Sequence, residues 1–285
     1  MISSIEAVRP GSLDDALGQL AARPELRVLA GGTDLMVLIN AGVESPASVM
    51  DVWHLDELRE ITVEDGHVVL GALTTYTELM TRPEVLEHLP ALAEAAGTVG
   101  AVQIQNRGTL GGNIMNASPA GDSLPPLAVY GAELELSSVR GRRRVPFNRF
   151  YSGYKILDRA PDEMLTRVRV PVPAAGLRHW FRKVGTRQAQ SISKVVAAGL
   201  VRVREDGTLA EARLAMGSVA PTVVRLPATE ALLEGRLPEG SLVEEVRASV
   251  RAEVHPIDDI RSTERYRLAV AGNVVARFVA GLAEH

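Results

Sequence analysis

The sequence predicts an α+β protein with a larger first domain and a smaller C-terminal domain of antiparallel sheet plus helices. In the first part, a strand-like run at 27–30 leads through a glycine turn into an apolar segment. Prolines and small residues at 171–176 then form a candidate domain boundary. Beyond it, apolar runs at 192–204 and 209–217 flank an Asp-Gly turn and precede helical patterns, which is typical of an antiparallel hairpin followed by helices.

The composition is that of an ordinary globular protein and excludes several classes of function. The chain has 285 residues, 46% of them hydrophobic and 23% charged, with a net charge of −4. Such a charge gives no basic field for nucleic acid or an anionic membrane, and no run of about 18 apolar residues predicts a membrane span. The N-terminus lacks the basic and apolar regions of a secretory signal, so we expect a cytoplasmic location.

The absence of cysteine narrows the redox chemistry that the chain could perform. Without thiols there can be no disulfide, no thiolate-held iron–sulfur cluster, no cysteine nucleophile and no cysteinyl-linked flavin. The six histidines never occur as a pair four residues apart, which argues against a zinc site on one helix. Any redox chemistry must therefore come from a bound organic cofactor or from a partner chain.

The first elements in the chain lead to a glycine turn. Ser12 is a candidate N-cap for a helix that should end near Arg23, since a proline follows it. A short buried strand is expected at 27–30, followed by the turn 31–35 and an apolar helix start at 36–39. A strand, a glycine turn and a helix start in this order aim backbone N–H groups at an anion.

The middle of the chain contains both strand and helix patterns. Strands are expected at 48–52, 68–72, 132–138 and 164–171, and helices at 76–80 and 91–96. The 132–138 segment alternates apolar and polar residues as a half-exposed strand should. Gly141 and the arginines after it, Arg142, Arg143 and Arg144, predict a turn. This basic run is either a docking or phosphate patch or, as we prefer, a solvated hairpin tip.

The C-terminal third is predicted to be a small sheet followed by helices. A strand at 180–184 precedes the hairpin, whose turn lies at 205–207. Helical patterns follow at 228–233, 242–254 and 263–282, and the last has apolar residues close to a period of 3.6.

The stretch 97–122 has the most unusual composition in the chain. It holds six glycines but only two charged residues, Arg107 and Asp122, whereas a solvated linker would usually be more charged. A core helix is disfavoured, because each interior glycine costs roughly 1 kcal/mol relative to alanine. We therefore expect tight turns whose free N–H groups approach the phosphate-bearing half of a nucleotide cofactor.

Two glycine-rich turns, 31–35 and 108–113, carry this prediction together. Neither has the Gly-Lys-Ser/Thr of a Walker loop, and neither matches Gly-x-Gly-x-x-Gly after a strand. Each by itself could be an ordinary tight turn. The pair is better explained by a shared ligand, because a pyrophosphate can be held by two sets of backbone N–H groups without a lysine.

Three motifs carry a resemblance to a known family. They are Ala-Gly-Gly-Thr-Asp-Leu at 30–35, Gln-Ile-Gln-Asn-Arg-Gly-Thr-Leu-Gly-Gly-Asn at 103–113 and Ala-Ser-Pro-Ala-Gly-Asp at 117–122. In this order they resemble the FAD-binding (medium) subunit of the molybdenum hydroxylases, which includes the flavoprotein subunits of carbon monoxide dehydrogenase and bacterial xanthine dehydrogenase. Phe-Arg-Lys at 181–183 and the final helices extend the resemblance over essentially the whole chain.

The resemblance implies a division of the chain into domains. An FAD-binding domain of two α/β subdomains would occupy 1–175, divided at about 1–54 and 55–175. A smaller C-terminal domain of carbon monoxide dehydrogenase flavoprotein type, with an antiparallel sheet and helices, would occupy 176–285.

The resemblance also implies which residues bind FAD. The first glycine turn would wrap the pyrophosphate, the second would cradle the phosphates and ribityl chain, Ser118 and Asp122 would bind FAD hydroxyls, and Lys183 would lie near the flavin ring. The implied cofactor-binding set is Ala30, Gly31, Gly32, Thr33, Asp34, Leu35, Asn106, Gly108, Thr109, Gly111, Gly112, Asn113, Ser118, Asp122 and Lys183.

Several of these positions also have simpler interpretations. Asp122 could be a helix N-cap, and Lys183 could be an exposed strand lysine. Tyr76, Tyr151 and Tyr154 are each at least as consistent with packing as with contact to the flavin.

Two departures from the family pattern concern the flavin ring. Position 105 is Gln where many relatives have Arg, and the stretch 188–192 lacks the tyrosine that some relatives carry beside the ring. Access to the ring, and with it the electron acceptor, can therefore differ in this chain.

The implied function is electron transfer within a complex. An iron–sulfur small subunit would supply electrons, a molybdopterin large subunit would hydroxylate the substrate, and FAD would pass electrons to NAD⁺, a quinone, oxygen or a carrier. One alternative is a stand-alone FAD-dependent oxidoreductase of reductase or alcohol-oxidase type. Another is a scaffold subunit that has lost its flavin.

Overall fold

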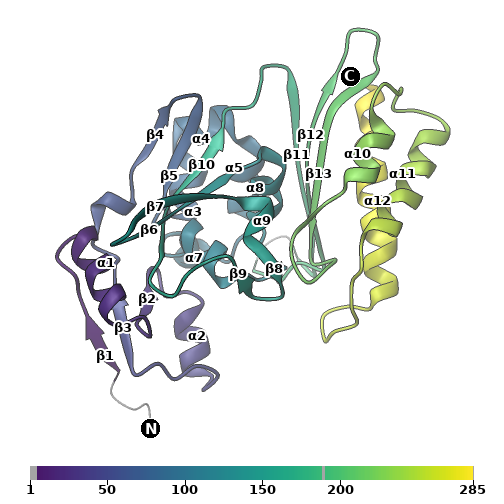
Figure 1. Ribbon diagram of the computed structural model, residues 1–285. Helices are drawn as coiled ribbons and strands as arrows, with labels where there is room; N and C mark the ends of the chain where they lie inside the picture. Colours follow the sequence, from purple (N-terminus) through teal and green to yellow (C-terminus); the bar gives the residue numbers. More distant parts are fainter. Residues whose placement is uncertain (1–4, 188–189, 285) are drawn as a thin grey trace.

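The computed structural model describes residues 5–187 and 190–284, so that Gln188 and Ala189 of the predicted ring-facing stretch lie outside the described residues. Three sheets with their helices follow one another from the N-terminal end of the molecule to the C-terminal end (Figure 1). Among the described residues, no helix combines the length and apolarity that a bilayer span requires.

The first sheet is parallel and small. Its strands are β1 (Glu6–Val8), β3 (Ser48–Asp51) and β2 (Arg27–Leu29), in that order, with helices α1 (Leu13–Ala22) and α2 (Leu35–Asn40). The predicted cap is confirmed, because the Ser12 hydroxyl accepts from the backbone N–H of Asp15 at 3.1 Å. The predicted burial of the 27–30 strand is wrong. β2 is an edge strand with an exposed Arg27, because only β3 pairs with it.

The second sheet is antiparallel and lies at the centre of the molecule. Its order is β4 (Ile61–Glu64), β5 (His67–Gly71), β10 (Met164–Pro171), β6 (Glu133–Ser138) and β7 (Gly141–Pro146). A short hairpin of β8 (Tyr151–Gly153) and β9 (Ile156–Leu157) lies beside it. The three-residue η1 turn, Asp56–Leu58, connects the first sheet to this one.

Strand β6 is more buried than its alternating pattern predicts. Its polar residues point to the face opposite the hydrophobic core, but neighbouring side chains cover them there. Glu135 lies within 4 Å of Arg142 and Arg144. Ser137 hydrogen bonds to Thr166 at 2.8 Å. The strand is internal, so neighbours on both sides cover the face that the alternation assigns to solvent.

The arginine run is a strand and not the predicted hairpin tip. The turn falls at residues 139–140, and Arg142, Arg143 and Arg144 lie along β7 at the edge of the sheet. Charged residues suit an exposed edge. These arginines lie close to the carboxylates of Glu135, Asp158 and Glu163. Arg143 illustrates this, with its Nε 2.7 Å from Glu163.

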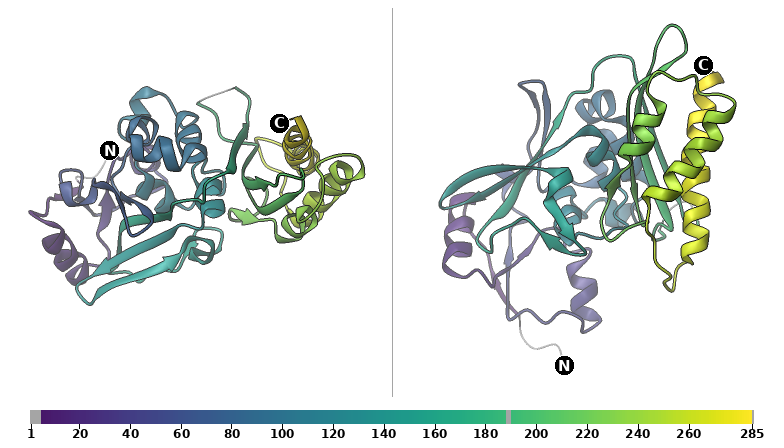
Figure 2. Two further views of the ribbon diagram at one scale, coloured as in Figure 1. Left: turned by 90° about the horizontal axis from the view of Figure 1, so that it is seen from above. Right: turned by 45° about the vertical axis from the view of Figure 1, so that its right-hand side comes forward.

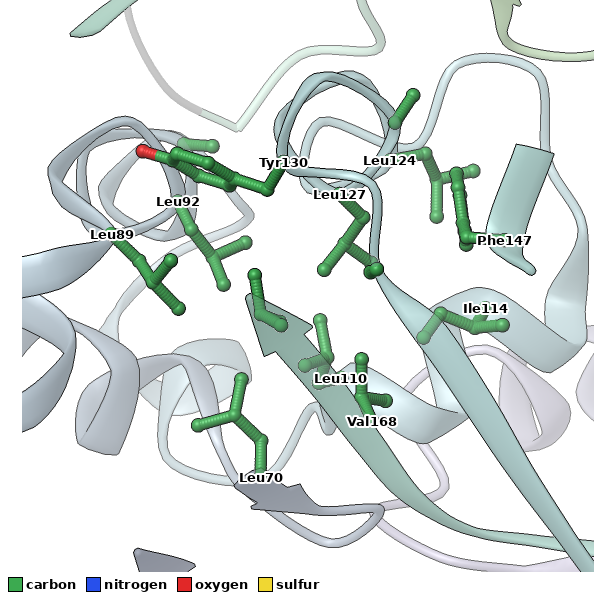
Figure 3. Packing of buried hydrophobic residues seen from close by; sticks show 14 of the residues in the cluster. Leu70, Leu89, Leu92, Leu110, Ile114, Leu124, Leu127, Tyr130, Phe147 and Val168 are labelled. Atoms are coloured by element: carbon green, nitrogen blue, oxygen red, sulfur yellow. The ribbon is translucent and has the colours of Figure 1, made fainter. Parts of the chain in front are cut away.

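Helices cover the central sheet and build the core (Figure 3). They are α3 (Tyr76–Thr81), α4 (Pro83–His88), α5 (Pro90–Gly97), α7 (Leu110–Asn116), α8 (Leu124–Tyr130) and α9 (Phe147–Phe150). The short helix α6 (Val102–Gln105) lies at the surface and has no buried residue. Leucines and other apolar residues from these helices meet Leu70 of β5 and Val168 of β10 in the cluster that Figure 3 shows.

Helix α7 contradicts the expectation that the glycine-rich stretch contains no core helix. Leu110 and Ile114 are fully buried, and Gly111 lies between them. A Cβ on Gly111 would lie 2.6 Å from the carbonyl oxygen of Ala72, so the glycine allows the helix to approach the end of β5. Close packing therefore offsets the cost of a helical glycine.

The third sheet and its helices form the C-terminal domain, as predicted. The antiparallel order is β11 (Leu177–Val184), β12 (Val195–Val203), β13 (Leu209–Gly217) and β14 (Val224–Arg225). Helices α10 (Pro227–Leu233), α11 (Ser241–Glu253) and α12 (Glu264–Gly281), with a final 3-10 turn at Leu282–Glu284, cover one face (Figure 2). Helices α5 and α8 of the first domain pack on the other face.

Candidate cofactor site

The first glycine loop, residues 30–35, follows β2 and leads into α2. Its conformation depends on Gly32, which has a φ of +75°. In the described part of the chain, the backbone N–H groups of Gly32, Thr33 and Asp34 donate to no other residue. Three unpaired donors at the end of a parallel strand suit an anionic group.

The second glycine loop differs from the prediction, because most of its N–H groups are used within the protein. The N–H groups of Leu110 and Gly111 donate to Thr74 at 2.8 Å and Ala72 at 2.9 Å. That of Gly112 donates to the Thr109 hydroxyl at 3.1 Å, which caps α7. This loop can therefore offer side chains and close approach to a ligand, while the first loop offers the backbone donors.

The two loops touch each other directly. A Cβ on Gly31 would lie 1.7 Å from the carbonyl oxygen of Arg107, and one on Gly108 would lie 2.8 Å from the Tyr76 ring. Gly31 is thus required by packing between the two loops, about 75 residues apart in sequence, where only a shared ligand was predicted. Gly108 is required by packing of the second loop on Tyr76 of α3.

A cavity of about 220 Å³ lies between the first and second sheets. Its walls are mostly apolar, with Leu26, Leu58 and Met115 among them, and Arg27 and Arg159 supply positive charge. We call this the apolar cavity. Its lining suits a flat, mostly apolar group.

A second cavity, of about 1100 Å³, lies between the first domain and the C-terminal domain. Residues 99–101 and 118–122 form one wall, and Lys183, Ser193 and the loop 255–261 form the other. We call this the interdomain cleft. The two cavities share the lining residues Thr33, Asp34, Tyr76, Asn113 and Asn116, so they adjoin at the first glycine loop.

Most of the predicted cofactor residues line this pair of cavities. Those on the apolar cavity are Ala30, Gly31, Gly32, Thr33, Asp34, Leu35, Thr109, Gly111, Gly112 and Asn113, and those on the interdomain cleft are Thr33, Asp34, Asn113, Ser118, Asp122 and Lys183. Asn106 and Gly108 line neither cavity. Asn106 accepts a hydrogen bond from Thr77 at 2.6 Å on the outside of the loop.

The tyrosines have different environments. Tyr76 lines both cavities and is buried, and this burial raises the pKa of its hydroxyl above the ordinary value. Tyr154 lines the interdomain cleft and is exposed. Tyr151 packs edge-on against Phe147 and Phe150 and its hydroxyl donates to the Ile114 carbonyl at 2.9 Å, so it is a packing residue.

Asp122 and Lys183 form a buried ion pair in the wall of the cleft. Lys183 Nζ lies 2.6 Å from Asp122 Oδ2 and donates to the Thr98 carbonyl at 2.9 Å. The Ser193 hydroxyl donates to Asp122 Oδ1 at 2.5 Å. Burial raises the pKa of the Asp122 carboxyl, while the Lys183 ammonium opposes that shift.

Both simpler interpretations of these residues are wrong. The residue before α8 is Ser123, and Asp122 does not cap the helix. The side chain of Lys183 is only 5% exposed, because β11 faces the first domain at this point.

Comparison with known proteins agrees with this geometry. Residues 3–173 match the family described as FAD binding domain in molybdopterin dehydrogenase. Residues 180–282 match the CO dehydrogenase flavoprotein C-terminal domain. This chain belongs to the molybdopterin dehydrogenase flavoprotein family. The resemblance seen in the three motifs is thereby confirmed.

Members of this flavoprotein family from several organisms are similar over nearly their whole length. The putative xanthine dehydrogenase FAD-binding subunit of Escherichia coli K12 is 36% identical, over 91% of this chain and 89% of that protein. The carbon monoxide dehydrogenase medium chain of Hydrogenophaga pseudoflava is 31% identical, over 94% and 93%. The structure of carbon monoxide dehydrogenase from that organism, lacking the Mo-pyranopterin moiety, superposes with a TM-score of 0.92, covering 97% of this chain and 96% of that chain at 31% identity.

The two places where the sequence departs from the expected family pattern both lie near the cleft. Gln105 Nε2 donates to the Val99 carbonyl at 3.1 Å, which ties α6 to the cleft wall. In the described part of the 188–192 stretch, Ile192 lines the cleft and is half exposed.

The sequence did not predict several residues that line the cavities. Asn116 lines both cavities, Arg159 and Glu163 line the apolar cavity, and His255 and Arg267 line the interdomain cleft, but none of them lies in a glycine motif. Asn116 follows the second glycine loop by one helical turn, and this spacing could have pointed to it. The others lie far along the chain and become neighbours of the site only through the fold.

Proposed function

We propose that this chain is the FAD-binding, electron-transferring medium subunit of a molybdenum hydroxylase complex. FAD would bind in the two adjoining cavities and take electrons from iron–sulfur centres of a partner subunit. The electrons would then pass to an external acceptor. The family membership and the continuous length of the site support this function.

The observation that carries the proposal is the position of the unpaired donors between the two cavities. FAD consists of two ring systems joined through a pyrophosphate, and the site has matching parts. The apolar cavity would take the adenosine end, and the N–H groups of Gly32, Thr33 and Asp34 would bind the pyrophosphate. The interdomain cleft would take the ribityl chain and the flavin ring.

Side chains of the second loop and of the cleft wall would orient the cofactor. Asn113 and Ser118 lie in the cleft near the shared lining and would bind ribityl hydroxyls. Lys183 has three N–H donors, two of which go to Asp122 and Thr98, so the third remains for the flavin. When bound, FAD itself supplies the one- and two-electron chemistry.

The buried carboxylate of Asp122 would determine where Lys183 lies. It accepts from Lys183, Ser193 and Thr98, and so fixes the ammonium against the first domain. Because the pair is close to neutral, Lys183 would act on the flavin mainly as an oriented donor.

The division into domains is part of the proposal. The first subdomain, about 1–54, would contain the parallel sheet, and the second, 55–175, the central antiparallel sheet. The C-terminal domain would be 176–285. The family matches at 3–173 and 180–282 and the start of the third sheet at Leu177 support these boundaries.

The proposal includes an iron–sulfur small subunit and a molybdopterin large subunit as partners, in a hetero-oligomer located in the cytoplasm. Several relatives are named as medium chains or FAD subunits of dehydrogenases, which favours the subunit over the stand-alone flavoenzyme alternative. The chain has no cysteine, so thiolate-held clusters would have to lie on a partner.

Purification of an affinity-tagged chain from its native host tests the proposal. We expect two further subunits to co-purify, one with iron and acid-labile sulfide and one with molybdopterin, together with FAD on this chain. A chain that purifies alone with FAD and turns over a substrate would support the stand-alone oxidoreductase instead.

A further inference from the structure

One residue, Arg107, contacts the two segments that follow β2 and β3. These strands are parallel neighbours, with Leu29 paired to Asp51, so the segments after them leave the same edge of the sheet. The first segment is the glycine loop 30–35, and the second contains Trp53. Arg107 belongs to the second subdomain and reaches both.

The backbone of Arg107 limits the position of the glycine loop. Its carbonyl group packs so closely on Gly31 that a Cβ there would lie 1.7 Å from the oxygen and 2.6 Å from the carbon. The segment itself is held in place, because the N–H of Arg107 donates to the Ile104 carbonyl at 3.1 Å. A loop pressed against a fixed carbonyl cannot move toward it.

The side chain of Arg107 holds the other segment. Its guanidinium carbon lies 3.7 Å from the centre of the Trp53 ring, within the range of a cation–π contact. Trp53 is in turn fixed to the first sheet, since its backbone N–H donates to the Asp51 carboxylate at 3.0 Å. Through this contact the second subdomain is attached to the end of β3.

We propose that Arg107 is a positioning residue for the cofactor site. Its cation–π contact with Trp53 keeps the first glycine loop in place against the second. The inference rests on the proposed function, because it concerns the affinity for FAD. Loss of the stack would let the first subdomain move away from Arg107 at Gly31. The unpaired donors of Gly32 and Thr33 would then lose their position relative to the apolar cavity.

Arg59 provides a matched control. Its guanidinium carbon lies 4.2 Å from the centre of the same Trp53 ring, and it donates to the Trp53 carbonyl at 2.5 Å. It therefore has the same charge and the same aromatic partner. The difference is that the glycine loop packs on the backbone of Arg107.

The experiment compares FAD binding by the full chain and its variants Arg107→Ala, Arg107→Lys and Arg59→Ala, using flavin fluorescence. Trp180→Phe is included in every variant, because it leaves Trp53 as the single tryptophan and its emission then reports whether the stack is intact. We expect red-shifted emission in both alanine variants. The Kd for FAD should rise about tenfold in Arg107→Ala, change less than about twofold in Arg59→Ala, and recover in part in Arg107→Lys.

An Arg107→Ala chain with unchanged FAD affinity would overturn the proposal. An Arg59→Ala chain that loses as much FAD affinity would also overturn it. Either arginine on Trp53 would then affect FAD binding only by stabilising the fold in general. Failure of the parent chain to bind FAD would contradict the proposed function itself, which separates the two outcomes.

Discussion

Lys183 Nζ lies 2.6 Å from Asp122 Oδ2, and this ion pair joins the C-terminal domain to the first domain. The two side chains are 5% and 7% exposed, so water does not screen the pair. The Ser193 hydroxyl donates to the other carboxylate oxygen, Oδ1, and the Thr98 hydroxyl donates to Oδ2. When one partner of such a buried, hydrogen-bonded ion pair is removed, the protein loses stability, because the remaining charge stays buried without a partner.

The first prediction concerns this pair. Asp122→Ala should destabilise the protein by about 3–5 kcal/mol, since it leaves the Lys183 ammonium buried without a counter-charge. The Tm should fall by roughly ten degrees for a chain of this size. Differential scanning fluorimetry measures this.

Two further variants show whether the loss of Tm comes from the buried charge. Asp122→Ala combined with Lys183→Met should recover part of the lost Tm, because no charge remains buried. Glu245→Ala removes an exposed pair with Arg236 and should leave the Tm almost unchanged, because water screens that pair. If Asp122→Ala alone leaves the Tm unchanged, the pair does not hold the domains together.

The second prediction separates packing from cofactor binding at two adjacent glycines. Gly111→Val should damage the fold, because its Cβ would meet the Ala72 backbone at 2.6 Å. At Gly112 a Cβ meets only the Thr109 hydroxyl, at 2.8 Å, so Gly112→Val should cost little more than the helix cap, about 1 kcal/mol.

Gly112 also lines the apolar cavity, so its valine variant should stay folded and lose FAD. Circular dichroism and the flavin content after purification give the two readouts. A folded Gly112→Val chain with full FAD occupancy would show that the adenosine end of FAD does not lie in the apolar cavity.

The third prediction is a pH dependence at the domain interface. His179 of β11 hydrogen bonds to the Tyr130 hydroxyl of α8 at 2.9 Å, and burial lowers the pKa of its imidazole. The folded chain therefore binds this proton less readily than the unfolded chain. Its contribution to stability is present above the unfolded pKa, about 6.5, and is lost as the pH falls below it.

Thermal unfolding measured from pH 8 to pH 5 tests this linkage. The Tm of the parent chain should fall more steeply below about pH 6.5 than that of His179→Phe, which keeps the ring but cannot titrate. Parallel curves for the two proteins would show that His179 does not contribute to the pH dependence.

Much of the fold follows from local patterns. The Ser12 cap, the Asp206-Gly207 hairpin turn and the helical period of the last segment each depend on neighbouring residues, and the structure confirms all three. The exposure of strands was predicted less well. Alternation in β6 indicates a solvent face, but its internal position in the sheet covers that face.

The cofactor residues were found by motif, whereas their contacts depend on the tertiary fold. The motif suggests that both glycine loops offer N–H groups, and only the packing of Gly111 on Ala72 shows where those of the second loop go. The pairing of Asp122 with Lys183 joins residues 61 positions apart, and no local pattern predicts it.

The most direct test of the account is the flavin content of the chain expressed alone. The purified protein should be yellow, and heat denaturation should release FAD, and not FMN, at about one molecule per chain. Added FAD should raise the Tm of any apoprotein, because ligand binding stabilises the folded state. A colourless chain that releases no flavin and shows no thermal shift with FAD would contradict the central claim.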